Sequence, residues 1–265
     1  AFATGSLITH SPDIPPLVLA AYSILLGACF GVVNGFFVAY ARVPSIIVTL
    51  GTMALFRSAL VEYSDAKSIT TNNLPTWLVE FPNTQLFTIG TFQFRAAFVV
   101  AILVVIAVHI TLSRVRPARK LYAVGSNPEA AEMSGINSKL VIFFAFVLAG
   151  ALAGLAGFMF LARFGTITVV AGLGFELKSV AAAVVGGVNI FGGSGSVIGA
   201  LIGTVLIDLI DMSLVRWQLV SEFWREAVLG SLILLSVAAD AVLMRRLVKW
   251  RVSREKKDAK PEVQA

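Results

Sequence analysis

The chain has 265 residues, of which 57% are hydrophobic and 14% are charged, and its formal net charge is +6 at pH 7. Soluble domains contain about 25% charged residues, so this composition excludes an ordinary soluble fold and favours a chain whose solvent is lipid. The apolar residues fall in long uncharged blocks without the period-two alternation of an outer-membrane barrel, which predicts an all-α, polytopic transmembrane helix bundle.

The apolar blocks predict the membrane-spanning helices. A helix needs about 20 apolar residues to cross a bilayer, so the first and fourth blocks are long enough alone, while the others are short or interrupted. Together the blocks predict a single transmembrane domain over 1–244, followed by a basic tail over 245–265. In chain order they are 14–40, 44–56, 96–113, 140–162, 179–207 and 227–244.

Glycine recurs at four-residue spacing within several blocks. Residues four apart share a helix face, and small residues there let two helix backbones approach closely in a membrane. We therefore expect these glycines to form packing faces in a compact bundle, one of which can also pair with a second membrane subunit. They are Gly27, Gly31 and Gly35 in the first block, Gly150 and Gly154 in the fourth, and Gly195, Gly199 and Gly203 in the fifth.

The fifth block, 179–207, is interrupted by a glycine cluster. Its two ends must emerge on the same face of the membrane, yet it is too short for two crossings of about 20 residues each. This predicts a pair of short or re-entrant half-helices joined through 189–195, and interrupted helices of that kind line substrate pathways in transporters. A plain tight turn between two thin spans is the alternative, and the glycines do not decide between the two.

Polar side chains in or beside the blocks are candidates for a translocation pathway. They are Asn34, Thr49, Asn189 and Ser194. For Asn34 an interhelical hydrogen bond is the simpler interpretation. Asp208 and Asp211 follow the fifth block and are expected to be solvated at the outer boundary, whereas Asp240 is expected to pair with the arginines that follow it.

The distribution of the 21 lysines and arginines predicts the orientation in the membrane. Most of them lie in 114–139 and in the tail, so the positive-inside rule places these segments in the cytoplasm and the loop 62–95 outside. The outer loop is expected to carry a short amphipathic piece around 77–81. The tail is explained as an anchor on anionic lipid rather than a nucleic-acid site, because no aromatic residues interleave with its cations.

A capped helix is predicted inside the cytoplasmic loop. Asn127 can cap it, Pro128 suits its first position, Glu129 favours the positive end of the helix dipole, and Gly135 can terminate it. A helix of about two turns is marginal by itself, so we expect it to lie on a partner protein or, alternatively, on the membrane.

This helix carries a resemblance to a known family. Glu129, Ala130 and Ala131, followed by Gly135, resemble the Glu-Ala-Ala-x-x-x-Gly coupling signature of ABC importer permeases. The wider string is similar to the ribose/xylose/rhamnose-type sugar permeases, the inner-membrane components of binding-protein-dependent transport systems. Three further stretches agree with that family in the same order, namely 31–40, 43–53 and 183–195.

The resemblance implies a permease subunit of an ABC importer that moves a monosaccharide, with a weak preference for rhamnose or a pentose, across the bacterial inner membrane. The implied partners are an ATP-binding cassette subunit docked through the capped helix, a second permease subunit in a homodimer or heterodimer, and a periplasmic sugar-binding protein. ATP would be used by the partner subunit. The family usually has further N-terminal helices, so we expect an incomplete permease. A permease for branched-chain amino acids and an ATP-independent secondary transporter or receptor remain as alternatives.

Enzyme function is not indicated by any motif. The sequence has no Gly-x-x-x-x-Gly-Lys-Ser/Thr loop, so the chain is not expected to hydrolyse ATP. Its single cysteine, Cys29, and its two separate histidines do not make a metal site. We therefore expect no catalytic residue, metal or cofactor.

Overall fold

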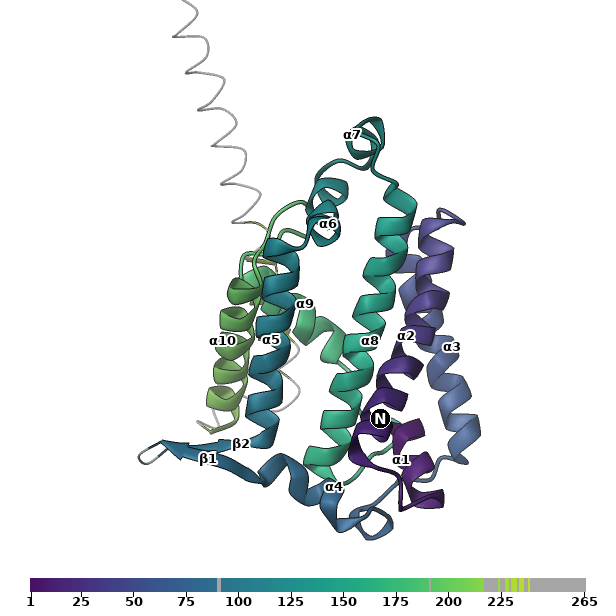
Figure 1. Cartoon of the computed structure of the whole chain (residues 1–265), viewed down its shortest axis with the longest axis vertical. Coiled ribbons are helices and arrows are strands. Elements are labelled where there is room, and N and C mark those ends of the chain that lie inside the picture. Colours follow the sequence, from purple (N-terminus) through teal and green to yellow (C-terminus); the bar gives the residue numbers. More distant parts are fainter. Residues whose placement is uncertain are drawn as a thin grey trace, which may run out of the picture. The chain divides into compact units, whose positions relative to one another are not determined.

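In the computed structural model, the chain forms two compact units, Ala1–Gly172 and Leu173–Ala265 (Figure 1). The structure describes residues 1–89, 92–190 and 192–216, together with single positions between 224 and 238. Apart from one two-stranded hairpin, the regular structure of these described residues is helical. Among them, 5 helices are long and apolar enough to cross a membrane. The prediction of an all-α, polytopic membrane bundle is confirmed.

The long helices of the first unit match the first four predicted spans. They are α2 (Pro16–Ala39), α3 (Ser45–Ser64), α5 (Ala96–Arg114) and α8 (Ser138–Phe164). The largest difference in length is in α3, because its apolar block stops before Arg57 while the helix continues until Asp65 adopts a left-handed φ of 48°. Arg57 is half-buried, and its long aliphatic stem lets the charged group reach polar surroundings, so one arginine did not end the helix.

Helices α2 and α8 pack backbone against backbone through their glycines. A Cβ atom built on Gly27 would overlap the Gly150 carbonyl oxygen and lie 2.8 Å from the Cα of Gly154. In the reverse direction, a Cβ on Gly150 would overlap the Gly27 carbonyl and lie 2.9 Å from the Cα of Gly31. Gly35 continues this face, where a Cβ would lie 3.0 Å from the Phe143 carbonyl. The two glycine series therefore face one another.

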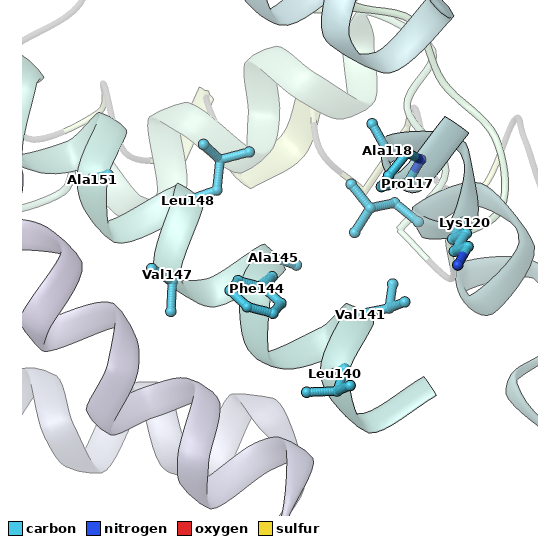
Figure 2. A pocket seen from close by; sticks show the side chains of 11 residues that line it. Pro117, Ala118, Lys120, Leu140, Val141, Phe144, Ala145, Val147, Leu148 and Ala151 are labelled. Atoms are coloured by element: carbon cyan, nitrogen blue, oxygen red, sulfur yellow. The ribbon is translucent and has the colours of Figure 1, made fainter. Parts of the chain in front are cut away.

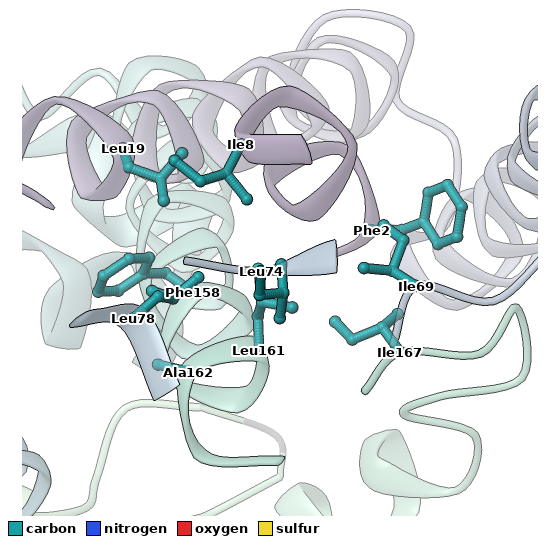
Figure 3. Packing of buried hydrophobic residues seen from close by; sticks show 10 residues of the cluster. All are labelled: Phe2, Ile8, Leu19, Ile69, Leu74, Leu78, Phe158, Leu161, Ala162 and Ile167. Atoms are coloured by element: carbon teal, nitrogen blue, oxygen red, sulfur yellow. The ribbon is translucent and has the colours of Figure 1, made fainter. Parts of the chain in front are cut away.

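A hydrophobic cluster closes the end of the unit where α2 begins and α8 ends (Figure 3). Its fully buried members include Ile8, Leu19, Leu78 and Leu161. One contributor is α1 (Phe2–His10), a helix that the sequence analysis did not predict. Where α1 meets α2, the buried hydroxyl groups of Thr4 and Ser23 share a hydrogen bond of 2.7 Å, which satisfies both.

The segment 62–95 folds onto this cluster rather than extending from it. Leu74 and Leu78 are buried, and Ile69 exchanges two backbone hydrogen bonds of 2.9 Å with Ile167, which lies beyond α8. The short amphipathic piece expected around 77–81 is present as a helix. In chain order the segment contains η1 (Thr71–Asn73), α4 (Thr76–Glu80), η2 (Phe81–Asn83), β1 (Gln85–Ile89) and β2 (Phe92–Arg95).

The antiparallel hairpin of β1 and β2 was not predicted. Phe87 pairs with Phe94 across the hairpin, and their rings stack with centroids 4.8 Å apart. The chain runs from β2 directly into α5, and α5 is followed by α6 (Arg116–Ser126) and then α7 (Pro128–Met133). The hairpin and α7 thus lie at opposite ends of this unit (Figure 1).

The second unit contains a helical pair, α9 (Phe175–Val185) and α10 (Val197–Arg216). A Cβ on Gly203 would overlap the Ala182 carbonyl oxygen, and one on Gly186 would overlap the Gly199 carbonyl, so the two backbones touch near the turn. The expected pair of half-helices is wrong for α10, which is long enough to cross a membrane, whereas α9 is short. Asp208 did not end the helix as the sequence pattern suggested.

Gly195 does not lie on the α10 packing face with Gly199 and Gly203. It precedes the helix and has a φ of 149°, with the Val188 side chain 3.1 Å from where its Cβ would be. The predicted pairing of Asp240, the tail 245–265 and most of the sixth block lie outside the described residues.

Candidate functional site

The capped helix predicted in the loop 114–139 is α7. Its start is capped by the Asn127 side chain, whose Oδ1 accepts a hydrogen bond of 3.0 Å from the Ala130 N–H, and Pro128 occupies the first turn. Its end is a left-handed turn at Gly135 with a φ of 78°, and the Ile136 N–H donates to the Ala131 carbonyl at 3.0 Å. The predicted cap at Asn127 and the predicted end at Gly135 both depend on hydrogen bonds between residues close together in the sequence.

Contacts on one side of α7 hold it against the start of α8. Ala131 is 5% exposed, and the Ser138 hydroxyl donates a hydrogen bond of 3.1 Å to the Pro128 carbonyl. Asn137 caps α8 in turn, because its Oδ1 accepts from the Leu140 N–H at 3.1 Å. A helix too short to be stable alone is thereby positioned by the long helix that follows it.

The outer side of α7 is exposed and carries both acidic and apolar groups. Glu129, Ala130 and Glu132 are exposed, and Met133 is 91% exposed. A fully exposed methionine beside carboxylates suits a partner surface that combines an apolar pocket with basic residues. Met133 was not among the predicted site residues, because its exposure depends on which side of α7 contacts α8.

The candidate pathway residues of the first unit lie on α2 and α3. Asn34 accepts a hydrogen bond of 2.7 Å at its Oδ1 from the Thr52 hydroxyl, which joins the two helices. Thr49 lies on the same helix as Thr52, but its hydroxyl donates to the Ser45 carbonyl of its own helix at 2.9 Å. The structure therefore pairs Asn34 with Thr52, a residue that the sequence analysis did not select.

The other two candidate pathway residues lie in the second unit. Asn189 and Ser194 flank the turn between α9 and α10, where the Asn189 N–H donates to the Ser194 carbonyl at 3.1 Å. The Ser196 hydroxyl then accepts from the Gly199 N–H at 2.9 Å and caps α10. Backbone and side-chain hydrogen bonds thus hold the described residues of this turn in place.

An ion-pair cluster joins α9 to α10 at a distance from the turn. Lys178 Nζ lies 2.7 Å from Asp208 Oδ1 and 3.1 Å from Asp211 Oδ2. The side chains are 28%, 47% and 13% exposed respectively, so the expectation that both aspartates are solvated is wrong for Asp211. Their spacing of three places both carboxylates on one helix face, a signal that the sequence analysis did not use.

The cluster changes the acidity of its lysine. Burial lowers the pKa of Lys178, but hydrogen bonds and charge attraction from Asp208 and Asp211 outweigh burial, so the pKa is raised above the usual lysine value. Lys178 therefore stays a cation at all physiological pH values and holds the two aspartates together.

Comparison with known proteins identifies relatives over most of the chain. Residues 1–237 match the family described as "Branched-chain amino acid transport system / permease component". The chain is 32% identical over 242 residues to the D-allose transport system permease protein of Escherichia coli K12, with 91% of this chain and 72% of the relative covered.

Two further relatives are equally similar. The autoinducer 2 import system permease protein of Yersinia enterocolitica is 32% identical over 235 residues, covering 89% of this chain and 63% of the relative. The fructose import permease protein of Rhizobium meliloti is 32% identical over 234 residues, covering 88% and 64%. The chain thus spans slightly less than two thirds of the length of these two relatives. No solved structure matches the chain.

Proposed function

Because the chain belongs to the family of branched-chain amino acid transport system permease components, we propose that it is the membrane-spanning permease subunit of an ATP-binding-cassette importer in the bacterial inner membrane. The proposed cargo is a monosaccharide. Two of the relatives support this class, since they are permeases for D-allose and fructose. ATP would be bound and hydrolysed by a partner subunit.

The observation that carries the proposal is the geometry of α7. A helix of 6 residues is capped at both ends, bound to α8 on its Ala131 side, and exposed on the side that bears Glu129 and Met133. Such a short, preorganised helix loses little conformational entropy when a partner binds it. We therefore assign α7 to docking of the ATP-binding subunit, with Glu129 and Ala130 on the contact surface and with Asn127, Ala131 and Gly135 holding the helix in place.

The proposed orientation places α6 and α7 in the cytoplasm. The cations of the loop 114–139 support this side, by the positive-inside rule. The segment 62–95, at the other end of α5, would then face the periplasm, where a sugar-binding protein delivers the cargo. A second permease subunit, identical or different, would complete the pathway, with Asn34, Thr49, Asn189 and Ser194 as candidate lining residues.

The docking proposal can be tested by co-purification of the full chain with its ATP-binding subunit. Glu129→Lys reverses a charge on the exposed side of α7 and should reduce the amount of ATP-binding subunit recovered by about tenfold, the cost of one lost charge-assisted contact. Glu80→Lys is the matched control, because Glu80 is equally exposed but lies in α4 at the opposite end of the unit. Equal recovery with both variants would contradict the docking assignment.

The cargo needs a separate measurement. Uptake by the reconstituted importer should be competed by monosaccharides and not by leucine, isoleucine or valine. The family's description makes branched-chain amino acids the second candidate cargo, and competition by these three amino acids would support it. Uptake that persists after the nucleotide site of the ATP-binding subunit is inactivated would instead point to an ATP-independent transporter.

A further inference from the structure

An apolar groove lies between three helices of the first unit. One part, of about 500 Å³, is lined by α6 and α8, and its lining includes Phe144 and Ala145 (Figure 2). A second part, of about 280 Å³, is lined by α5, α6 and α8. The two parts adjoin, because Ala118, Leu121 and Leu148 line both.

The lining of the groove accepts hydrocarbon and little else. Its side chains are apolar except Thr111, whose hydroxyl donates to the Ala107 carbonyl of its own helix at 2.7 Å, and Lys120. Apart from Lys120, the lining side chains offer water no free hydrogen-bond partner, so an apolar occupant is favoured. It lies along α5 and α8, both of which are long and apolar enough to cross the membrane.

One cation of α6 belongs to the lining of the groove. Helix α6 is amphipathic, with Leu121 lining the groove and Val124 only 4% exposed, while Arg116, Arg119 and Lys120 are exposed and Lys120 also lines the groove. No carboxylate among the described residues forms an ion pair with these three cations. Amphipathic helices with this pattern lie at the membrane surface and attract anionic lipid headgroups.

We propose that this groove binds one anionic phospholipid. Its acyl chains occupy the space between α5 and α8, and its phosphate is bound by Lys120. Because Lys120 is the cation of an otherwise apolar lining, the site distinguishes an anionic amphiphile from both a soluble anion and a neutral lipid. The proposal depends on the membrane location of the chain and is independent of what the chain transports.

The lipid would also brace the connection between α5 and α7. Helix α6 follows α5 directly and leads into α7 through Asn127. A lipid in the groove contacts the side of α6 that lines it, and without a lipid this side of α6 would cover an empty apolar space. The bound lipid therefore stabilises the position of α7.

The test measures lipid retention by the purified full chain in detergent, using native mass spectrometry with added phosphatidylglycerol or phosphatidylcholine. We expect one retained phosphatidylglycerol per chain and weaker retention of phosphatidylcholine. Replacing Lys120 by glutamine should weaken phosphatidylglycerol binding about fivefold and leave phosphatidylcholine unchanged. Arg42→Gln is the matched control, because Arg42 is an exposed cation that does not line the groove.

A second variant tests the apolar part of the site. Ala118→Trp fills the region that both parts of the groove share and should abolish retention, whereas Ala54→Trp on the exposed face of α3 should not. Equal retention of both lipids by the unchanged chain would overturn the proposal, as would undiminished retention by Ala118→Trp. A lipid-independent dimer that Ala118→Trp dissociates would also overturn it and identify a second copy as the occupant.

Discussion

The glycine contact between α2 and α8 makes a sharp prediction for Gly27→Ala. The new methyl group would overlap the Gly150 carbonyl oxygen and lie 2.8 Å from the backbone nitrogen and Cα of Gly154. All of these are backbone atoms, so no side-chain rotation can relieve the overlap and the helices must separate. Ordinary carbon contacts lie at about 3.5–4.0 Å, so the separation is about 1 Å or more and weakens dispersion along the interface.

The expected size of the effect follows from overpacking and helix propensity. Overpacking in a well-packed interior costs about 1–3 kcal/mol, while alanine gains up to about 1 kcal/mol over glycine in a helix. Gly51→Ala in α3 isolates the second term, because nothing lies within 4 Å of its added Cβ. We therefore expect Gly27→Ala to be less stable than Gly51→Ala by about 2 kcal/mol.

The assay is the free energy of unfolding in mixed micelles, titrated with a denaturing detergent and followed by circular dichroism. Comparing the two variants cancels the propensity term, so the difference reports only the α2–α8 contact. If the two variants agree within about 0.5 kcal/mol, the backbone contact does not exist as described and the reasoning fails.

The remaining predictions concern polar contacts between helices. Lys178→Met should lower the free energy of unfolding by about 1–3 kcal/mol, because it leaves two carboxylates without their cation, and Asp211→Asn should cost more than Asp208→Asn because Asp211 is more buried. Since the pKa of Lys178 is raised on folding, its contribution to the free energy of unfolding is complete below the ordinary lysine pKa of about 10.4. The contribution declines only as the pH rises through the pKa of the folded state. An unfolding midpoint that moves with Lys178 ionisation between pH 7 and 9 would therefore contradict the assignment. Thr52→Val should cost about 0.6 kcal/mol, the mean for interhelical hydrogen bonds in membranes, and should have no effect in an Asn34→Leu background, which a double-mutant cycle measures.

The parts of the fold that depend on local composition were predictable from the sequence. The spans α2 and α8 were predicted because uninterrupted apolar blocks report membrane helices directly. The caps of α7 were likewise predictable, since Asn127 and Gly135 act only on neighbouring backbone groups. The strands β1 and β2 were missed, although alternation around Phe87 carried a usable signal.

The parts that depend on distant partners were not predictable. Helix α10 continues past Asp208 because Lys178, far away in the sequence, neutralises the carboxylate that defined the end of the apolar block. The burial of α1 has the same origin, because the cluster around Leu161 covers it and its own sequence has no distinctive pattern. For the candidate site, exposure of Met133 required knowing which side of α7 contacts α8.

The cluster around Leu161 also has a consequence for the order of folding. It joins Ile8, Ile69 and Ile167, which lie far apart along the chain, so it has a high contact order and a large loop-closure entropy. It cannot form until α8 has been synthesised, whereas α2 and α3 can enter the membrane earlier. During that interval Leu74 is uncovered. Translation slowed or halted before Leu161 should therefore give a chain that is correctly inserted but prone to aggregation.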